Sequence, residues 1–258
     1  MLIATPLSHL FRHKKAIAKV VNISNCFECR DASFHSDINR QYLYHSDISI
    51  VKNWEENEEI KHLYLIKNFK KDLKLISFHI PSCYSNPIIK NGIFQSNGKK
   101  FTKKEMLRNA KDNLKILKEI LSNDILIAIE NNNYYPSEAY DIITDSSFLL
   151  EIVYDNKINF LFDISHAIIS SYNKKISYHY YIKNLPLEKC IQVHISRYSI
   201  KDGIARDNHN RPDNEIYKLL LDILKDYNNV KYLTIEYYKS IDTLFNIIKE
   251  VKNLIKKV

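Results

Sequence analysis

Ionisable side chains stand at or just after the ends of several short apolar runs in this sequence. The clearest case is LFDISHA at residues 161–167, where the apolar run stops at Asp163 and His166 follows three residues later. Histidine, aspartate or glutamate occupies a corresponding place after other runs. The full set is His45, His79, Glu130, Asp163, His166, His194, Asp207, His209 and Glu236.

Each of these residues alone has an ordinary explanation. An aspartate that ends a strand often caps the next helix, and the aspartate of a D-x-H loop often forms an Asx turn. All of them in one place, however, need strong positive charge to balance the carboxylates and occupy the imidazole nitrogens. Two or three metal ions that share carboxylates would supply it. Because histidine with carboxylate suits iron, zinc or manganese, and the set contains no cysteine, we predict a multinuclear site for such a metal.

The elements that must bring these residues together are strands and helices in alternation. Amphipathic helical patterns separate the apolar runs; one of them, at residues 102–121, opens with a capping box of Thr102 and Glu105. Such alternation predicts parallel β–α units and an α/β fold, a (β/α)8 TIM barrel that forms a single domain over residues 1–258. The predicted strands are residues 2–7, 24–29, 42–48, 73–80, 125–130, 158–163, 190–196 and 231–236.

Side-chain alternation predicts which strand residues face the inside of the barrel. In the sixth predicted strand, Phe160 and Phe162 share an outer, helix-facing side, and Asp163 lies on the inner side. In the seventh, the same rule assigns Ile191 to the outer side and Cys190 to the inner side. The inner face ends in an ionisable residue on several strands. In a barrel that residue stands at the carboxyl-terminal rim, where active sites are built.

Composition and charge argue against several other classes. The 258 residues carry a net charge of +8, but the lysines are spread along helix faces, so we do not expect nucleic-acid binding. No run of 18 apolar residues predicts a membrane span, and the amino-terminal pattern is not that of a signal peptide. Four cysteines do not make a disulfide framework, which favours the cytoplasm. Cys26 and Cys29 form a C-x-x-C on a predicted strand, where they would point to opposite faces rather than form a redox or metal pair.

The order H…H…E…D-x-x-H…H…D-x-H…E on a predicted barrel resembles a known family. The segments IAIENNNYYP, FLFDISHAIISSYN, NLPLEKCIQVHIS, RDNHNRPDNEIYKLL and LTIEYY are similar, in order and spacing, to motifs of the multinuclear non-haem iron-dependent oxidative enzymes (MNIO). Many members have asparagine where His166 stands, and a subset that resembles the methanobactin-biosynthesis oxidase keeps histidine. Endonuclease IV and xylose isomerase-like barrels are more distantly similar.

The resemblance implies an enzyme that uses two or three iron ions, mixed ferrous and ferric, with O2 as co-substrate. It would oxidise a residue, cysteine in our expectation, of a ribosomally synthesised precursor peptide. Glu130, Asp163, His194 and Glu236 would hold the inner ions. The remaining ligands would be His166, Asp207 and His209 for another ion, with His45 and His79 completing the set. A separate small partner protein would recognise the leader peptide.

Three other functions stay open from the sequence. An endonuclease IV-like, zinc-dependent phosphodiesterase acting on abasic DNA would use a similar ligand order. The glycine-containing run that follows D-x-H in endonuclease IV is replaced here by RPDNEIYKLL, which argues against it. A non-redox sugar isomerase could use the same barrel. A metal-storing or peptide-binding barrel without turnover is the non-enzymatic alternative.

Overall fold

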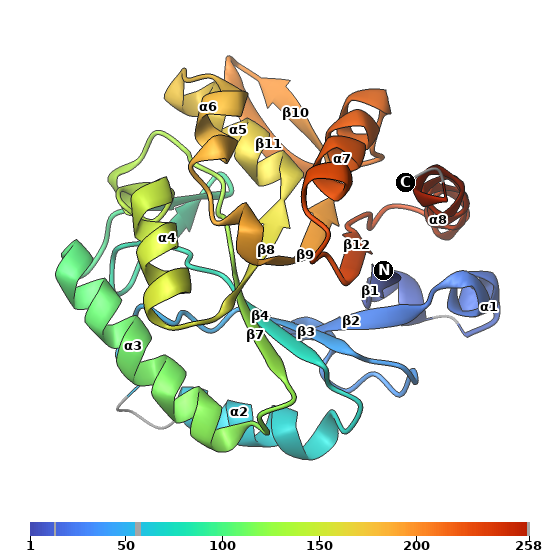
Figure 1. The fold of residues 1–258 in the computed structure, drawn as a ribbon, viewed down its shortest axis with the longest axis horizontal. Helices are drawn as coiled ribbons and strands as arrows, with labels where there is room; N and C mark the ends of the chain where they lie inside the picture. Colours follow the sequence, from blue (N-terminus) through green and yellow to red (C-terminus); the bar gives the residue numbers. More distant parts are fainter. Residues whose placement is uncertain (13, 55–57, 257–258) are drawn as a thin grey trace.

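Eight parallel strands close into a barrel in the computed structural model, which describes residues 1–12, 14–54 and 58–256 (Figure 1). Each predicted strand falls on one barrel strand, so the predicted fold is confirmed. The order around the barrel is β1-β12-β9-β8-β7-β4-β3-β2. The strands are β1 (Leu2–Pro6), β2 (Cys26–Arg30), β3 (Leu43–Ser46), β4 (Leu75–Phe78), β7 (Leu126–Glu130), β8 (Asn159–Asp163), β9 (Cys190–Ile195) and β12 (Tyr232–Ile235).

Helices cover the outer face of the barrel (Figure 1). The predicted capping box forms in α3, where Thr102 accepts the backbone N–H of Glu105. In the described segment between β2 and β3, residues 31–42, a short 3₁₀ turn at Asp31–Ser33 stands in place of an α-helix. The helices are α1 (Lys14–Ile23), α2 (Glu58–Phe69), α3 (Lys103–Ile120), α4 (Ser146–Asp155), α5 (Ile164–Lys174), α6 (Tyr178–Lys183), α7 (Asn214–Asp226) and α8 (Ile241–Ile255).

Two β-hairpins are inserted into the links that follow β4 and β9. The first pairs β5 (Ile88–Lys90) with β6 (Ile93–Gln95), and the second pairs β10 (Arg197–Lys201) with β11 (Ile204–Asn210). Their turns are Asn-Gly and Asp-Gly, with positive φ at both residues, as in the hairpin turns that suit twisted strands. The prediction that the D-x-H motif lies in a loop is therefore wrong, because Asp207 and His209 lie on β11.

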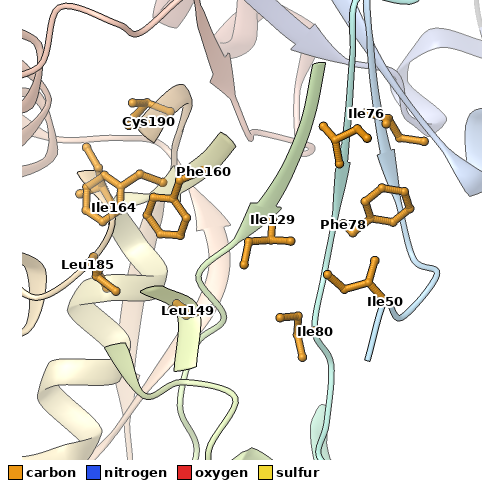
Figure 2. Close-up of a cluster of buried hydrophobic side chains, with 14 of the residues drawn as sticks. Ile50, Ile76, Phe78, Ile80, Ile129, Leu149, Phe160, Ile164, Leu185 and Cys190 are labelled. Atoms are coloured by element: carbon orange, nitrogen blue, oxygen red, sulfur yellow. The ribbon is translucent and has the colours of Figure 1, made fainter. Parts of the chain in front are cut away.

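The outer faces of the strands pack against the helices in a large apolar core. Figure 2 shows part of it, with Phe160 of β8 beside Ile164 of α5. Phe160 and Phe162 lie outside, as predicted. A smaller cluster fills the inside of the barrel toward the amino ends of the strands. Its buried members are Ala4, Cys26, Leu43, Leu75, Ala128, Leu161, Ile191 and Tyr232.

The predicted orientation of Cys190 and Ile191 is wrong. Ile191 belongs to the inner cluster, and Cys190 packs in the outer core (Figure 2). The cause is a register shift between β8 and β9, where Phe160 pairs with Cys190 and Leu161 pairs with Gln192. The extra residue on β9 forms a bulge, which breaks the simple alternation. Beyond the bulge the prediction holds again, and His194 faces inward beside Asp163.

The C-x-x-C residues lie on opposite faces of β2, as predicted. Cys26 belongs to the inner cluster and Cys29 to the outer core. All four cysteines are free thiols buried in the structure. Within the described residues, no helix combines the length and the apolar character needed to cross a bilayer.

Candidate metal centre

The barrel strands carry most of the predicted ligands to one rim. His45 lies near the end of β3, and Glu130 and Asp163 are the last residues of β7 and β8. His194 lies on β9, and His166 lies in the first turn of α5. His79 and Glu236 directly follow β4 and β12, so they also stand at the carboxyl ends of strands. Asp207 and His209 come from the β10–β11 hairpin, where they lie on β11.

Short contacts between ring nitrogens and carboxylate oxygens connect these residues to one another in space. Glu130 is central: its Oε2 lies 2.8 Å from His79 Nδ1, and its Oε1 lies 3.1 Å from His194 Nδ1. His45 Nε2 lies 2.7 Å from His79 Nε2. His194 Nδ1 is also 3.2 Å from Glu236 Oε1. The imidazoles of His45, His79 and His194 therefore converge on the carboxylates of Glu130 and Glu236.

The hairpin completes the other side of the network. His209 Nε2 lies 3.1 Å from Glu236 Oε2 and 3.2 Å from Asp207 Oδ2. The same Asp207 oxygen lies 3.2 Å from His166 Nε2. His166 in turn approaches the central carboxylate, with Nδ1 3.8 Å from Glu130 Oε1. The contacts thus form a closed circuit that starts and ends at Glu130.

Asp163 joins this network while also capping a helix. Its Oδ1 accepts the backbone N–H of His166 at 2.7 Å, which makes it the N-cap of α5. The side chain of Asn131 bonds to the backbone N–H and C=O of Asp163, at 2.8 and 2.9 Å, and so fixes its position. The second oxygen, Oδ2, is buried and finds no hydrogen-bond partner in the described part of the chain. The helix cap and the ligand prediction are therefore compatible.

The chemistry of this donor set fits a bound cation. Both oxygens of Glu130 and Nδ1 of His194 are buried, and each lacks a hydrogen bond of good geometry to any described residue. Buried polar atoms are normally paired, because leaving them unpaired costs free energy. Among the residues that the structure describes, three groups of donors lie close enough together to hold an ion: His45, His79 and Glu130; Glu130, Asp163 and His166; and Glu28, His194 and Glu236.

Hydrogen bonds on the far side of the rings orient two of the histidines. His166 Nδ1 lies 2.9 Å from the carbonyl oxygen of Asn131 and donates to it, so Nε2 is the nitrogen directed at Asp207. His45 Nδ1 bonds to the hydroxyl of Ser77 at 2.7 Å. Metal-bound histidines are typically held in this way by a second hydrogen bond. His45 and His166 therefore present Nε2 to the centre.

Burial sets the protonation of two imidazoles. It lowers the pKa of His45 to about 3, and the neighbouring His79 acts in the same direction. It also lowers the pKa of His209 to about 4, in spite of the adjacent Asp207 carboxylate. Both rings are therefore neutral near pH 7, which is the form that binds metal.

Burial and the neighbouring histidines set the pKa values of the carboxylates. Burial opposes ionisation of Glu130, but the surrounding imidazoles, His79 first, hold its pKa well below the usual range. Burial raises the pKa of Asp163 to about 6. For Asp207, His209 and His166 outweigh burial and hold the pKa at about 2. All three carboxylates are therefore ionised at neutral pH, as coordination of a cation requires.

Comparison with known proteins assigns the chain to a family. The sequence model of a family described as "RiPP precursor modification enzyme MbnB/TglH/ChrH" matches residues 100–258, which is more than half of the chain. The chain belongs to this family. The matched segment runs from the start of α3 through β12 and α8, and it includes every predicted ligand except His45 and His79. The resemblance to the MNIO enzymes is thereby confirmed.

Curated relatives of this RiPP-modifying family member are distant. UPF0276 proteins from two strains of Caulobacter vibrioides are 24% identical to the chain over 100 residues. That segment is 39% of this chain and 35% of each relative, so the match spans about a third of the relatives' length.

Solved structures similar to this MNIO chain share its barrel. A D-tagatose 3-epimerase-like protein superposes with a TM-score of 0.63 at 16% identity, covering 100% of this chain and 98% of that one. A xylose isomerase-like TIM barrel protein from Mycobacterium smegmatis, in complex with magnesium, gives 0.62 at 10% identity, with coverage of 99% and 97%. D-psicose 3-epimerase from Clostridium cellulolyticum H10 gives 0.58 at 15% identity, with coverage of 100% and 99%. At these identities the likeness establishes the xylose isomerase-like fold alone.

Two charged residues beside the centre of this MNIO chain, Glu28 and Arg30 of β2, were not among the predicted site residues. Glu28 is fully buried and lies 2.9 Å from His194 Nε2. Burial opposes protonation of His194, but the Glu28 carboxylate outweighs it and raises the pKa of that ring to about 9. Arg30 contacts both Glu28 and Glu236. Alternation along β2 could have revealed both residues, because they share the inner face with Cys26.

A cleft of 1020 Å³ opens beside the centre, between α1 and residues 32–40. That segment belongs to the link between β2 and β3, whose described residues form a short 3₁₀ turn and no α-helix. Apolar side chains that include Phe11, Val21 and Ile38 line the cleft, and its inner end reaches Arg30 and Tyr238. The Tyr238 hydroxyl lies 3.4 Å from Glu236 Oε1, and its ring packs 5.0 Å from that of His209. Tyr238 therefore borders both the cleft and the predicted ligands.

Proposed function

We propose that this chain is an iron-dependent oxidase that uses O2 to modify a cysteine of a ribosomally synthesised precursor peptide. The observation that carries the proposal is the closed circuit of imidazoles and carboxylates around Glu130, several of whose buried donor atoms lack hydrogen bonds within the described residues. The circuit suits two or three divalent or trivalent ions. Family membership supports a peptide as the substrate.

The proposed ligands divide according to their contacts. Glu130, Asp163, His194 and Glu236 would hold the inner ions, since Glu130 approaches both His194 and the Asp163–His166 group. His166, Asp207 and His209 would hold a further ion, since both imidazoles approach the same Asp207 oxygen. The set is completed by His45 and His79, which lie on the other side of Glu130.

Mixed ferrous and ferric ions at this centre would supply electrons for the reduction of O2 and a Lewis acid for the substrate thiolate. The protein would contribute position and exclusion of water. Glu130, Asp163 and His194 are almost completely buried, so the centre is accessible mainly from the rim. The cleft beside Tyr238 would give a peptide a route to that rim.

The peptide would be delivered by a separate small protein that recognises its leader. The cleft between α1 and residues 32–40 would receive the peptide from that protein. We infer that the enzyme works in the cytoplasm, where its buried thiols, all free, would stay reduced.

Anaerobic purification followed by metal analysis tests the proposal. We expect two or three iron ions per chain and, after admission of air, mixed-valence absorption and magnetic signals. A short, cysteine-bearing open reading frame beside the gene would identify the peptide, and mass spectrometry after incubation with it should show oxidation at cysteine. Zinc alone, unaffected by iron reconstitution, together with cleavage of abasic DNA, would instead establish the phosphodiesterase.

A further inference from the structure

Both carboxylate oxygens of Glu28, which lies next to the proposed centre, accept hydrogen bonds. It lies on β2, inside the barrel, with no exposed surface. Its Oε2 accepts hydrogen bonds from Gln192 Nε2 at 2.6 Å and from Thr234 Oγ1 at 3.1 Å. The same oxygen lies 2.9 Å from His194 Nε2, and Oε1 accepts from Arg30 at 2.8 Å. Three strands therefore contribute groups that hold this one carboxylate.

The contact with Glu28 determines where the proton of His194 lies. An unprotonated Nε2 would direct its lone pair at a carboxylate oxygen in the dry interior, which is repulsive, so Nε2 must donate. Gln192 Nε2 is also 2.9 Å from His194 Nε2, but its amide hydrogens are directed to Glu28 and to Thr234, at 2.6 and 2.9 Å. The Nε2 proton of His194 therefore belongs to the bond with Glu28.

The opposite ring nitrogen then faces the proposed ligands. His194 Nδ1 lies 3.1 Å from Glu130 Oε1 and 3.2 Å from Glu236 Oε1. It is buried and forms no well-directed hydrogen bond with the residues that the structure describes. Because Glu28 holds the Nε2 proton, Nδ1 is the nitrogen left for a metal ion, which would take the place of a proton between Nδ1 and the carboxylates of Glu130 and Glu236. This orientation is the reverse of that of His166, which presents Nε2.

The spacing of Glu28, His194 and Glu236 would by itself admit an ion. The guanidinium of Arg30 already stands between the two carboxylates, in contact with Glu28 Oε1 and Glu236 Oε1. A second cation there would be repelled by that fixed positive charge. Glu28 is therefore placed to support a ligand rather than to be one.

We propose that Glu28, held by Arg30, is a positioning residue that fixes His194 as an Nδ1 ligand of the metal centre. The inference rests on the proposed metal ligands but requires neither iron nor oxidase activity. Carboxylate partners of this kind raise the basicity of a ligating imidazole, and their loss typically lowers metal affinity about 10- to 100-fold.

Histidine NMR on the whole protein tests the proposal without any substitution. Protein labelled with 15N-histidine is compared before and after addition of Zn²⁺, which is diamagnetic. We expect the Nε2 proton of His194 in both states and a large shift of its Nδ1 resonance with zinc. An Nε2 without its proton in both states would overturn the inference. A retained Nε2 proton with no response of Nδ1 to zinc would refute His194 as a ligand, and so the proposed centre, but not the contact with Glu28.

Substitution gives a second, independent readout. Glu28→Gln should lower Zn²⁺ affinity about 10- to 100-fold in a chelator competition assay. The matched control is Asp31→Asn, because Asp31 follows the same strand and bonds to an imidazole, that of His62, away from the centre. The control should keep wild-type affinity. Equal affinity in Glu28→Gln and the wild type would contradict the proposal, and NMR still decides if Glu28→Gln does not fold.

Discussion

Asp163 and His166 are joined by a hydrogen bond that shows how one carboxylate can cap a helix and still serve a metal. Asp163 Oδ1 accepts the backbone N–H of His166 at 2.7 Å. Asp163 Oδ2 remains free of hydrogen bonds to the described residues and lies in a donor group with Glu130 and the His166 ring. The helix α5 therefore starts at the point where its first turn can deliver a ligand.

Replacing Asp163 with asparagine should separate these two roles. Asparagine caps helices about as well as aspartate, so α5 should form and the metal-free protein should be no less stable. The substitution also removes one of two neighbouring buried negative charges. It therefore relieves the repulsion between residue 163 and Glu130 in the metal-free protein. We expect at least one metal ion fewer by elemental analysis. Asp163→Ala, which removes the cap as well, should additionally lower the unfolding free energy by about 0.5–2 kcal/mol. Full metal content in Asp163→Asn would show that Oδ2 is not a ligand.

His166→Asn should lower the metal count without unfolding the barrel. The N-cap bond uses only the backbone N–H of residue 166, so α5 keeps its start. The ring contact with Asp207 Oδ2 is lost, and with it the proposed third-ion site. The circular dichroism spectrum should stay unchanged, while the metal content measured by elemental analysis should fall toward two ions per chain. An unchanged count would mean that His166 is not a ligand.

Removal of metal should destabilise the wild-type protein. An ion that binds only the folded state at 100 times its dissociation constant contributes about 2.7 kcal/mol. For a protein of this size, that corresponds to a fall in Tm of roughly 5–10 °C on chelation. Thermal unfolding with and without chelator measures the shift. Glu130→Gln lacks the central carboxylate and should show a much smaller shift, whereas an equal shift in both proteins would indicate metal bound elsewhere.

The strands could be predicted because their apolar runs are separated by long amphipathic helices. His194 and Glu130 could be assigned to the rim because alternation places their side chains inward. The predicted faces of Cys190 and Ile191 were wrong because β9 has a bulge there. A bulge depends on the pairing between two strands, so the sequence of one strand does not reveal it.

Other errors had signals that were present in the sequence. The dipeptide Asp202–Gly203 adopts positive φ at both residues and closes the β10–β11 hairpin, and such a dipeptide is a recognised hairpin signal. Polar residues on both sides of β11 concealed the strand, so Asp207 was predicted in a loop. Glu28 was missed because the end of β2 was predicted at Cys29, one residue before Arg30.

The cleft beside Tyr238 leads to a last prediction, on Ala18→Trp in α1. Ala18 is exposed and lines the cleft, so an indole there would occupy space that the peptide needs without touching the centre. We expect the KM for the peptide encoded beside the gene to rise about tenfold, equivalent to about 1.4 kcal/mol of binding free energy. Metal content and Tm should stay near wild type. Lys111→Trp on α3, an exposed position outside the cleft, is the control and should leave KM unchanged. If both variants modify the peptide with wild-type kinetics, the peptide reaches the centre by another route.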